Sequence, residues 1–127
     1  DFCLSRGLGD VYKRQAYYDA GGLSVSPGNP QDVKACVNVT HPTVRLSIAS
    51  GDPGASLSVT ALFNVGATTV AIPVGTVSVT PGVSPVMTIH VVNLAALSAG
   101  GTVPVTLRIS AQGGSANGDV WVDPWGG

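Results

Sequence analysis

The sequence predicts an all-β protein, an antiparallel β-sandwich of the jelly-roll type that lacks its first strand or strands. Apolar and polar side chains alternate over short segments, most clearly at Val103, Val105, Leu107 and Ile109, and this is the period of a half-buried strand. Strong turn formers separate these segments, as in GDPG at residues 51–54, and no segment has a helical period. Roughly eight or nine short strands at this spacing are typical of a sandwich or jelly roll.

The first predicted strands are short and end at prolines. Residues 23–26 form the first strand, which the sequence PGNP at residues 27–30 ends. Residues 35–39 form the second, and Pro42 separates it from a third strand at residues 43–49, because proline cannot donate a ladder hydrogen bond. One face of the third strand is apolar, formed by Val44, Leu46 and Ile48.

The remaining strands follow the same rule of alternation between turns. Asn64-Val65-Gly66 and Pro81-Gly82 are turn signals, residues 94–101 are a connection, and residues 113–118 are a polar loop. The predicted strand at residues 56–64 has one apolar face, formed by Leu57, Val59, Ala61 and Phe63. The further predicted strands are residues 56–64, 68–72, 75–80, 86–93, 103–109 and 119–123.

Residues 1–15 resemble a translated sequencing-library adapter. Residues 10–15, DVYKRQ, can be encoded by GAT-GTG-TAT-AAG-AGA-CAG, the end of a transposase adapter, and residues 5–9 continue it in frame. We therefore interpret residues 1–15 as an adapter-derived, disordered segment to be excluded from the fold. Residues 16–127 are then the module itself, N-terminally truncated and from a metagenomic open reading frame. The alternative is that residues 2–15 are a genuine basic segment.

The charge of the chain argues against nucleic acid as a partner. Only 10% of the residues are charged, against about 25% in typical globular domains. Outside residues 1–15 the cations are Lys34, Arg45 and Arg108, too scattered for a phosphate-binding surface. A neutral surface of hydroxyls and amides is common in secreted β modules. No apolar run is long enough to span a membrane.

Cysteine usage depends on the interpretation of residues 1–15. The sequence has two cysteines, Cys3 and Cys36. If Cys3 is adapter-derived, Cys36 is a lone buried thiol or has lost a partner that preceded residue 16. If residues 1–15 are genuine, Cys3 and Cys36 are a candidate disulfide. The chain has no CxxC motif and no His/Cys cluster, so we expect no zinc site.

Four sequence blocks resemble the C-terminal part of uncharacterised secreted proteins from actinobacteria. They are CVNVTHPTVR at residues 36–45, VGTV at residues 74–77, PVM at residues 85–87 and GDVWVDPW at residues 118–125. The resemblance implies a galactose-binding-domain-like jelly roll, the fold of many carbohydrate-binding modules, and a secreted location. It carries no established activity.

The chain departs from that family in two places. Asn117-Gly118-Asp119 stands where the family tends to have an aromatic, an aliphatic and two acidic residues. The family's opening segment is also absent, because residues 1–15 occupy its place. We therefore expect the sandwich to expose a sheet edge that invites pairing with other chains.

One set of outward-facing residues is the predicted ligand-binding site. If Val44, Leu46 and Ile48 face the core, Arg45 faces out, and Arg108 faces out by the same argument on residues 103–109. Val120 and Val122 would turn the neighbouring side chains outward. The resulting candidates for a sugar-binding surface are Trp121, Arg45, Arg108, Asp119 and Asp123. An aromatic ring stacks on a sugar, and Arg and Asp hydrogen-bond its hydroxyls, although Arg–Asp pairs across strands are also ordinary surface stabilisers.

The sequence offers no catalytic constellation. It has no GxSxG motif, and the absence of glutamate argues against a paired-carboxylate glycosidase. His41 and His90 are interpreted as structural. Asp119 and Asp123 are too few oxygen ligands to establish a calcium site. We therefore expect no catalytic residues, no metal and no cofactor.

Taken together, the residues predict a non-catalytic extracellular β-sandwich module that binds carbohydrate. The alternative is a structural or adhesive surface domain without a small-molecule ligand, in which Trp121 covers apolar surface or meets another domain. The expected partner is a glycan or another protein domain, not nucleic acid, and no membrane span is expected.

Overall fold

A computed structural model of the chain describes residues 18–37, 42–65, 67–90 and 103–123. Within them the protein folds into eight strands without a helix. The strands are β1 (Tyr18–Val25), β2 (Gln31–Val37), β3 (Thr43–Gly51), β4 (Ser56–Val65), β5 (Thr68–Ser78), β6 (Val86–Thr88), β7 (Val103–Gln112) and β8 (Ala116–Asp123). The prediction of an all-β protein is confirmed.

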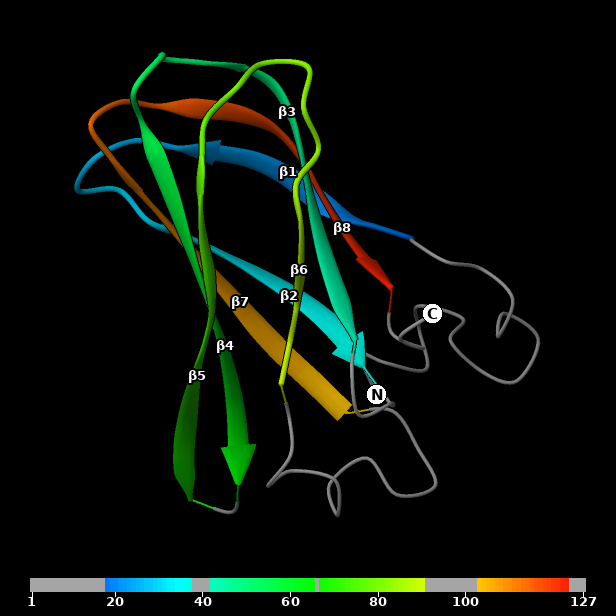
Figure 1. Ribbon diagram of the computed structural model, residues 1–127. Coiled ribbons are helices and arrows are strands. Elements are labelled where there is room, and N and C mark those ends of the chain that lie inside the picture. The colour runs from blue at the N-terminus through cyan, green and yellow to red at the C-terminus, as the bar shows by residue number, and fades with distance from the viewer. Residues whose placement is uncertain (1–17, 38–41, 66, 91–102, 124–127) are drawn as a thin grey trace.

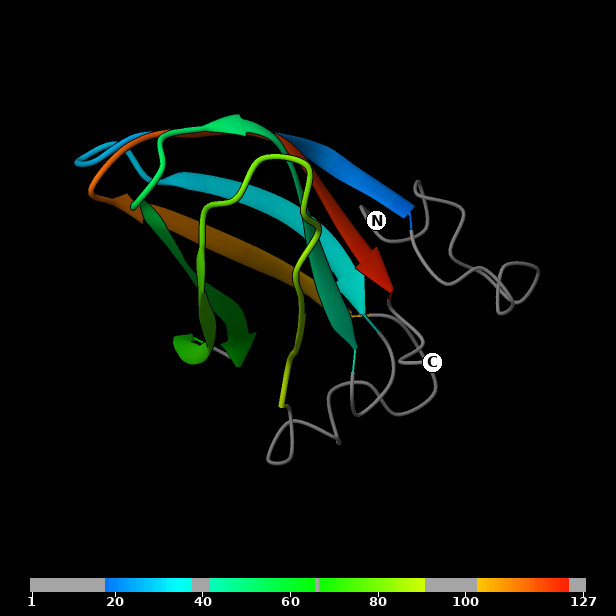
Figure 2. The same ribbon diagram turned by 45° about the horizontal axis from the view of Figure 1, so that its top comes forward.

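The strands form two antiparallel four-stranded sheets that pack face to face (Figures 1 and 2). The first sheet has the order β1-β8-β3-β6 and the second the order β2-β7-β4-β5. Successive strands alternate between the sheets except for the β4–β5 hairpin, which is the wrapping of an eight-stranded jelly roll. The predicted jelly-roll sandwich is therefore confirmed. Whether a further strand precedes β1 concerns residues 1–17, which lie outside the described residues.

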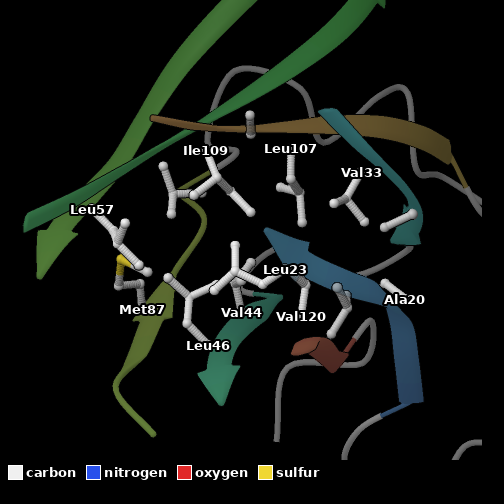
Figure 3. Packing of buried hydrophobic residues seen from close by; sticks show 14 of the residues in the cluster. Ala20, Leu23, Val33, Val44, Leu46, Leu57, Met87, Leu107, Ile109 and Val120 are labelled. Carbon is white, nitrogen blue, oxygen red and sulfur yellow. The ribbon is translucent and has the colours of Figure 1, made fainter. Parts of the chain in front are cut away.

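The core lies between the two sheets, where alternating side chains interdigitate (Figure 3). Leu46 of β3 and Leu107 of β7 are both fully buried and come from opposite sheets. The predicted inward faces of these strands are confirmed. The apolar residues of this core that the prediction named are Val44, Leu46, Ile48, Leu57, Val59, Ala61, Phe63, Val105, Leu107, Ile109, Val120 and Val122.

Both predicted Pro-Gly turns are present. Ala55 N donates to Asp52 O at 3.1 Å across Pro53-Gly54, and Val83 N donates to Thr80 O at 3.1 Å across Pro81-Gly82. Gly54 and Gly82 have φ values of 88° and 85°. Proline at the first central position and a left-handed glycine at the second are the requirements of a type II turn.

Two predicted strands proved to be one. Residues 68–72 and 75–80 were expected to be separate strands, but β5 runs from the first into the second through Pro73 and Gly75. The pairing skips one residue of β5, since Val59 is opposite Gly75 while Thr60 is opposite Pro73. β5 is an edge strand, and an edge tolerates proline and a bulge where a central strand would not. Of the strand expected at residues 86–93, β6 covers residues 86–88, and residues 91–93 lie outside the described residues.

Of the alternatives left open for Cys36, the lone buried thiol is wrong. Cys36 is fully buried near the end of β2 and is disulfide-bonded. The other cysteine of the sequence, Cys3, lies outside the described residues.

Candidate functional site

The outer face of the first sheet brings four side chains into one row across all four strands. Asp19 of β1 is opposite Trp121 of β8, Trp121 is opposite Arg45 of β3, and Arg45 is opposite Val86 of β6. These residues point outward because their neighbours along β3 and β8 are buried in the core. Side chains in register on adjacent strands are close enough to interact.

Arg45 and Trp121 form the centre of this row. The guanidinium carbon Cζ of Arg45 lies 5.5 Å from the centre of the Trp121 ring, within the range of a cation–π contact. Both side chains are half-buried. The pair therefore presents an aromatic ring and a guanidinium together on the middle of the sheet, as the sequence predicted for these two residues.

Two carboxylates flank the Arg45–Trp121 pair. Asp119 is opposite Ser47 on one side and Gly22 on the other. Asp19 accepts a hydrogen bond from Gly21 N through Oδ1 at 3.0 Å, which orients its carboxylate next to the register bulge of β1. The predicted residue Asp119 thus lies on the same face as Arg45 and Trp121, and Asp19, which was not predicted, lies there too.

Asp123 does not belong to the exposed surface that was predicted for it. It is opposite Thr43 at the end of β8, and only 4% of it is exposed. Alternation decides which side of a strand a residue occupies, but it does not decide whether that side is covered at the end of the strand.

Arg108 lies on the other face of the molecule, so the prediction of one surface that combines both arginines is wrong. β7 is a central strand of the second sheet, whereas β3 and β8 belong to the first. Arg108 Nε donates to Asp32 Oδ1 at 2.9 Å, and its Nη2 donates to Asp32 Oδ2 at 3.0 Å. The hydrogen bonds lower the pKa of the Asp32 carboxyl and raise the pKa of Arg108. Arg108 thus forms a bidentate surface ion pair with Asp32.

Exposed apolar residues extend the site towards β6. Val86 is 53% exposed and Val83 is 48% exposed, and Val86 continues the row from Arg45. Val83 precedes β6 and accepts a hydrogen bond from Ile48 N through its carbonyl oxygen at 3.3 Å. The sequence did not single out these valines or Asp19, because their relation to Trp121 depends on strand pairing rather than on any local pattern.

The described residues contain no group of three or more His, Cys, Asp or Glu side chains placed to hold a metal ion. His90 is exposed, and His41 lies outside the described residues. In the same part of the chain no helix is long and apolar enough to cross a membrane.

Comparisons with known proteins add little to this picture. No protein-family model matches the chain, and no curated protein matches it. Among solved structures, that of infectious bursal disease virus Gx strain is similar over 87% of this chain, with 20% sequence identity and a TM-score of 0.37. The match spans 29% of the viral chain. A likeness at this level carries no argument about function, so the fold rests on the strand order itself.

Proposed function

We propose that this chain is a non-catalytic extracellular β-sandwich module that binds carbohydrate through the outer face of the first sheet. The observation that carries the proposal is the Arg45–Trp121 pair, 5.5 Å apart on adjacent central strands. We name this surface the Trp121 face and define it as Asp19, Arg45, Val86, Asp119 and Trp121. The resemblance to secreted actinobacterial proteins, itself a proposal, implies a secreted location and the fold of many carbohydrate-binding modules.

The chemistry of the Trp121 face suits a sugar. An indole ring offers a rigid apolar surface of large area, on which the apolar side of a pyranose ring can stack. The guanidinium of Arg45 supplies only donors, and the carboxylates of Asp19 and Asp119 supply acceptors when ionised. A sugar hydroxyl both donates and accepts, so this set of groups matches it.

The charges of the face favour a neutral glycan. The face has two carboxylates, Asp19 and Asp119, and one guanidinium, which lies against the Trp121 ring. An anionic polysaccharide would meet more like charge than opposite charge on such a surface. The proposed ligand is therefore a neutral polysaccharide or oligosaccharide.

The second candidate is a structural or adhesive domain that packs against other chains without a small-molecule ligand. It is favoured by a different part of the molecule, because residues 53–107 contain no Asp, Glu, Lys or Arg. A stretch of this kind lacks the charges that keep surfaces apart.

A panel of insoluble polysaccharides together with a glycan array tests the leading proposal. We expect the protein to be retained by at least one neutral glycan and Trp121→Ala to weaken that binding by about tenfold or more. Leu62→Ala is the control, since Leu62 is half-buried on β4 of the other sheet. Circular dichroism verifies that each variant is folded, and Arg45→Ala tests the same face if Trp121→Ala does not fold. Absence of binding to every glycan, or equal loss in the control, contradicts the proposal.

A further inference from the structure

The two sheets have four edge strands, and three of them are protected against pairing with another chain. The free edge of β1 is closed by a side chain. Gln31 accepts a hydrogen bond from Ser24 N through Oε1 at 2.7 Å and donates from Nε2 to Gly22 O at 2.7 Å. A side-chain amide thus occupies the two backbone groups that a new strand would need. Near its start, β1 also has the register bulge between Asp19 and Gly21.

β2 and β6 are protected in other ways. β2 has the exposed charged residues Asp32 and Lys34, and charges on an edge strand oppose the approach of another strand. β6 has only three residues, Val86–Thr88. Short edge strands offer too few backbone groups to template a partner.

β5 is the exception. It has eleven residues, Thr68–Ser78, and none of them is charged. Among the described strands, β4 is its only neighbour in the sheet. Pro73 and the skipped residue between Pro73 and Gly75 interrupt its second half, but residues 68–72 precede both. Within that first half Thr68, Thr69 and Ala71 are exposed.

We propose that residues 68–72 pair with the same residues of a second copy of this chain, antiparallel and about a twofold axis through Val70. A twofold interface must be self-complementary, because each residue contacts its own symmetry mate or a residue close to that mate. The paired segments bring no charge together, and no Asp, Glu, Lys or Arg occurs anywhere in residues 53–107. Two copies of residues 68–72 therefore do not repel each other electrostatically, and the segment offers no charge that would attract a charged partner.

The twofold axis determines the shape of the dimer. Antiparallel pairing within one sheet requires an axis perpendicular to that sheet, so β2-β7-β4-β5 continues into its copy as eight strands. Within the described residues each copy has one such edge, so this contact closes as a dimer instead of growing into a fibre. Both copies of the first sheet then lie on the same side of the extended sheet. If the Trp121 face binds glycan, as proposed above, the dimer presents two such faces to one surface and gains avidity.

Sedimentation equilibrium over a concentration series tests the dimer. A contact of this length places it among weak, transient associations, so we expect a monomer–dimer equilibrium. Ala71→Lys puts a charge on the exposed side of the free edge and should raise the dissociation constant by about tenfold. Gln112→Lys is the matched control, with the same charge on an exposed side chain of the central strand β7. A protein that is monomeric throughout, or equal effects of the two lysines, overturns the proposal.

A cysteine pair tests the register independently. In the proposed dimer Val70 lies directly opposite Val70 of the partner subunit, at a separation that a disulfide can bridge. Mild oxidation should therefore convert Val70→Cys, but not Thr76→Cys, into a covalent dimer. Equal cross-linking of both variants overturns the register. These measurements need no glycan, so failure of carbohydrate binding and failure of the dimer are separately visible.

Discussion

The two sheets each place one arginine on the outer side of a central strand, and the two arginines differ in their partners. Arg108 on β7 pairs with the carboxylate of Asp32 through two hydrogen bonds, and 49% of its side chain is exposed. Arg45 on β3 is half-buried against the ring of Trp121. Arg108 therefore belongs to a polar ion pair, whereas Arg45 and Trp121 together form a mixed aromatic and polar surface. This difference is why we propose the ligand site on the first sheet.

The core beneath the two arginines is where substitution should have the largest effect on stability. Leu46 and Leu107 are the inward neighbours of Arg45 and Arg108, and both are fully buried. Leu46→Ala and Leu107→Ala should each lower the free energy of unfolding by about 2–5 kcal/mol. Denaturant unfolding measures this, with Arg45→Ala and Arg108→Ala as the outward controls. If an outward variant is as destabilising as its inward neighbour, that arginine is a structural residue.

Gly118 should matter next, because it lets β3 and β8 come together beside the Trp121 face. A Cβ at Gly118 would overlap the carbonyl oxygen of Ser47 and lie 3.0 Å from Ala49 N, where β3 is bulged. Backbone atoms cannot yield as a side chain does, so Gly118→Ala should cost about 1–3 kcal/mol. Thermal unfolding measures the change. Gly22→Ala on the adjacent β1 is the control, since its nearest atom lies at 3.9 Å, and a similar loss there would show that the packing argument is wrong.

The Asp32–Arg108 pair should give a small, pH-dependent effect. Arg108 lowers the pKa of Asp32 below its usual value of 3.8. Because the lowered pKa belongs to the folded state, the stabilisation is complete above the unfolded pKa and disappears as the pH falls through the folded pKa.

The test compares Asp32→Asn with the unmodified chain from pH 7 to acid. We expect a modest stability difference near neutral pH that shrinks once the pH falls below about 4. Added salt should also reduce it, because the pair is exposed. A difference that is constant over this pH range would show that the ion pair is not its source.

Deletion of residues 1–15 tests the interpretation of that segment as adapter-derived, which predicts no effect on stability. Cys36 is disulfide-bonded, and a disulfide that belongs to a fold typically stabilises it by about 2–4 kcal/mol. Thermal unfolding of the full chain and of the deletion variant decides whether residues 1–15 are adapter-derived or belong to the fold. The reduced full chain is the control. A clear drop in Tm on deletion would show that the segment belongs to the protein.

The sequence predicted those features that depend on local alternation. The period of residues 103–109 and of Val44, Leu46 and Ile48 was enough to identify strands and their buried sides. The turns at Pro53-Gly54 and Pro81-Gly82 followed from backbone geometry that few other residues satisfy. These features are set by neighbours along the chain.

The features that the sequence did not predict depend on which strands become neighbours in space. Arg45 and Arg108 look equivalent along the chain, and only the strand order places them on opposite faces. Asp19 and Val86 join Trp121 for the same reason. The capping of β1 by Gln31 joins residues at most nine apart in the sequence. It nevertheless depends on the chain crossing from the first sheet to the second between β1 and β2, which no local pattern predicts.

The most direct test of the assignment is a pair of binding isotherms for Arg45→Ala and Arg108→Ala on the glycan that retains the unmodified protein. Both variants remove one guanidinium from a central strand, and they alter opposite faces of the molecule. We expect Arg45→Ala to weaken binding by about tenfold and Arg108→Ala to bind as the unmodified protein does. Equal affinity for Arg45→Ala, or a loss confined to Arg108→Ala, would place the ligand elsewhere and contradict the account.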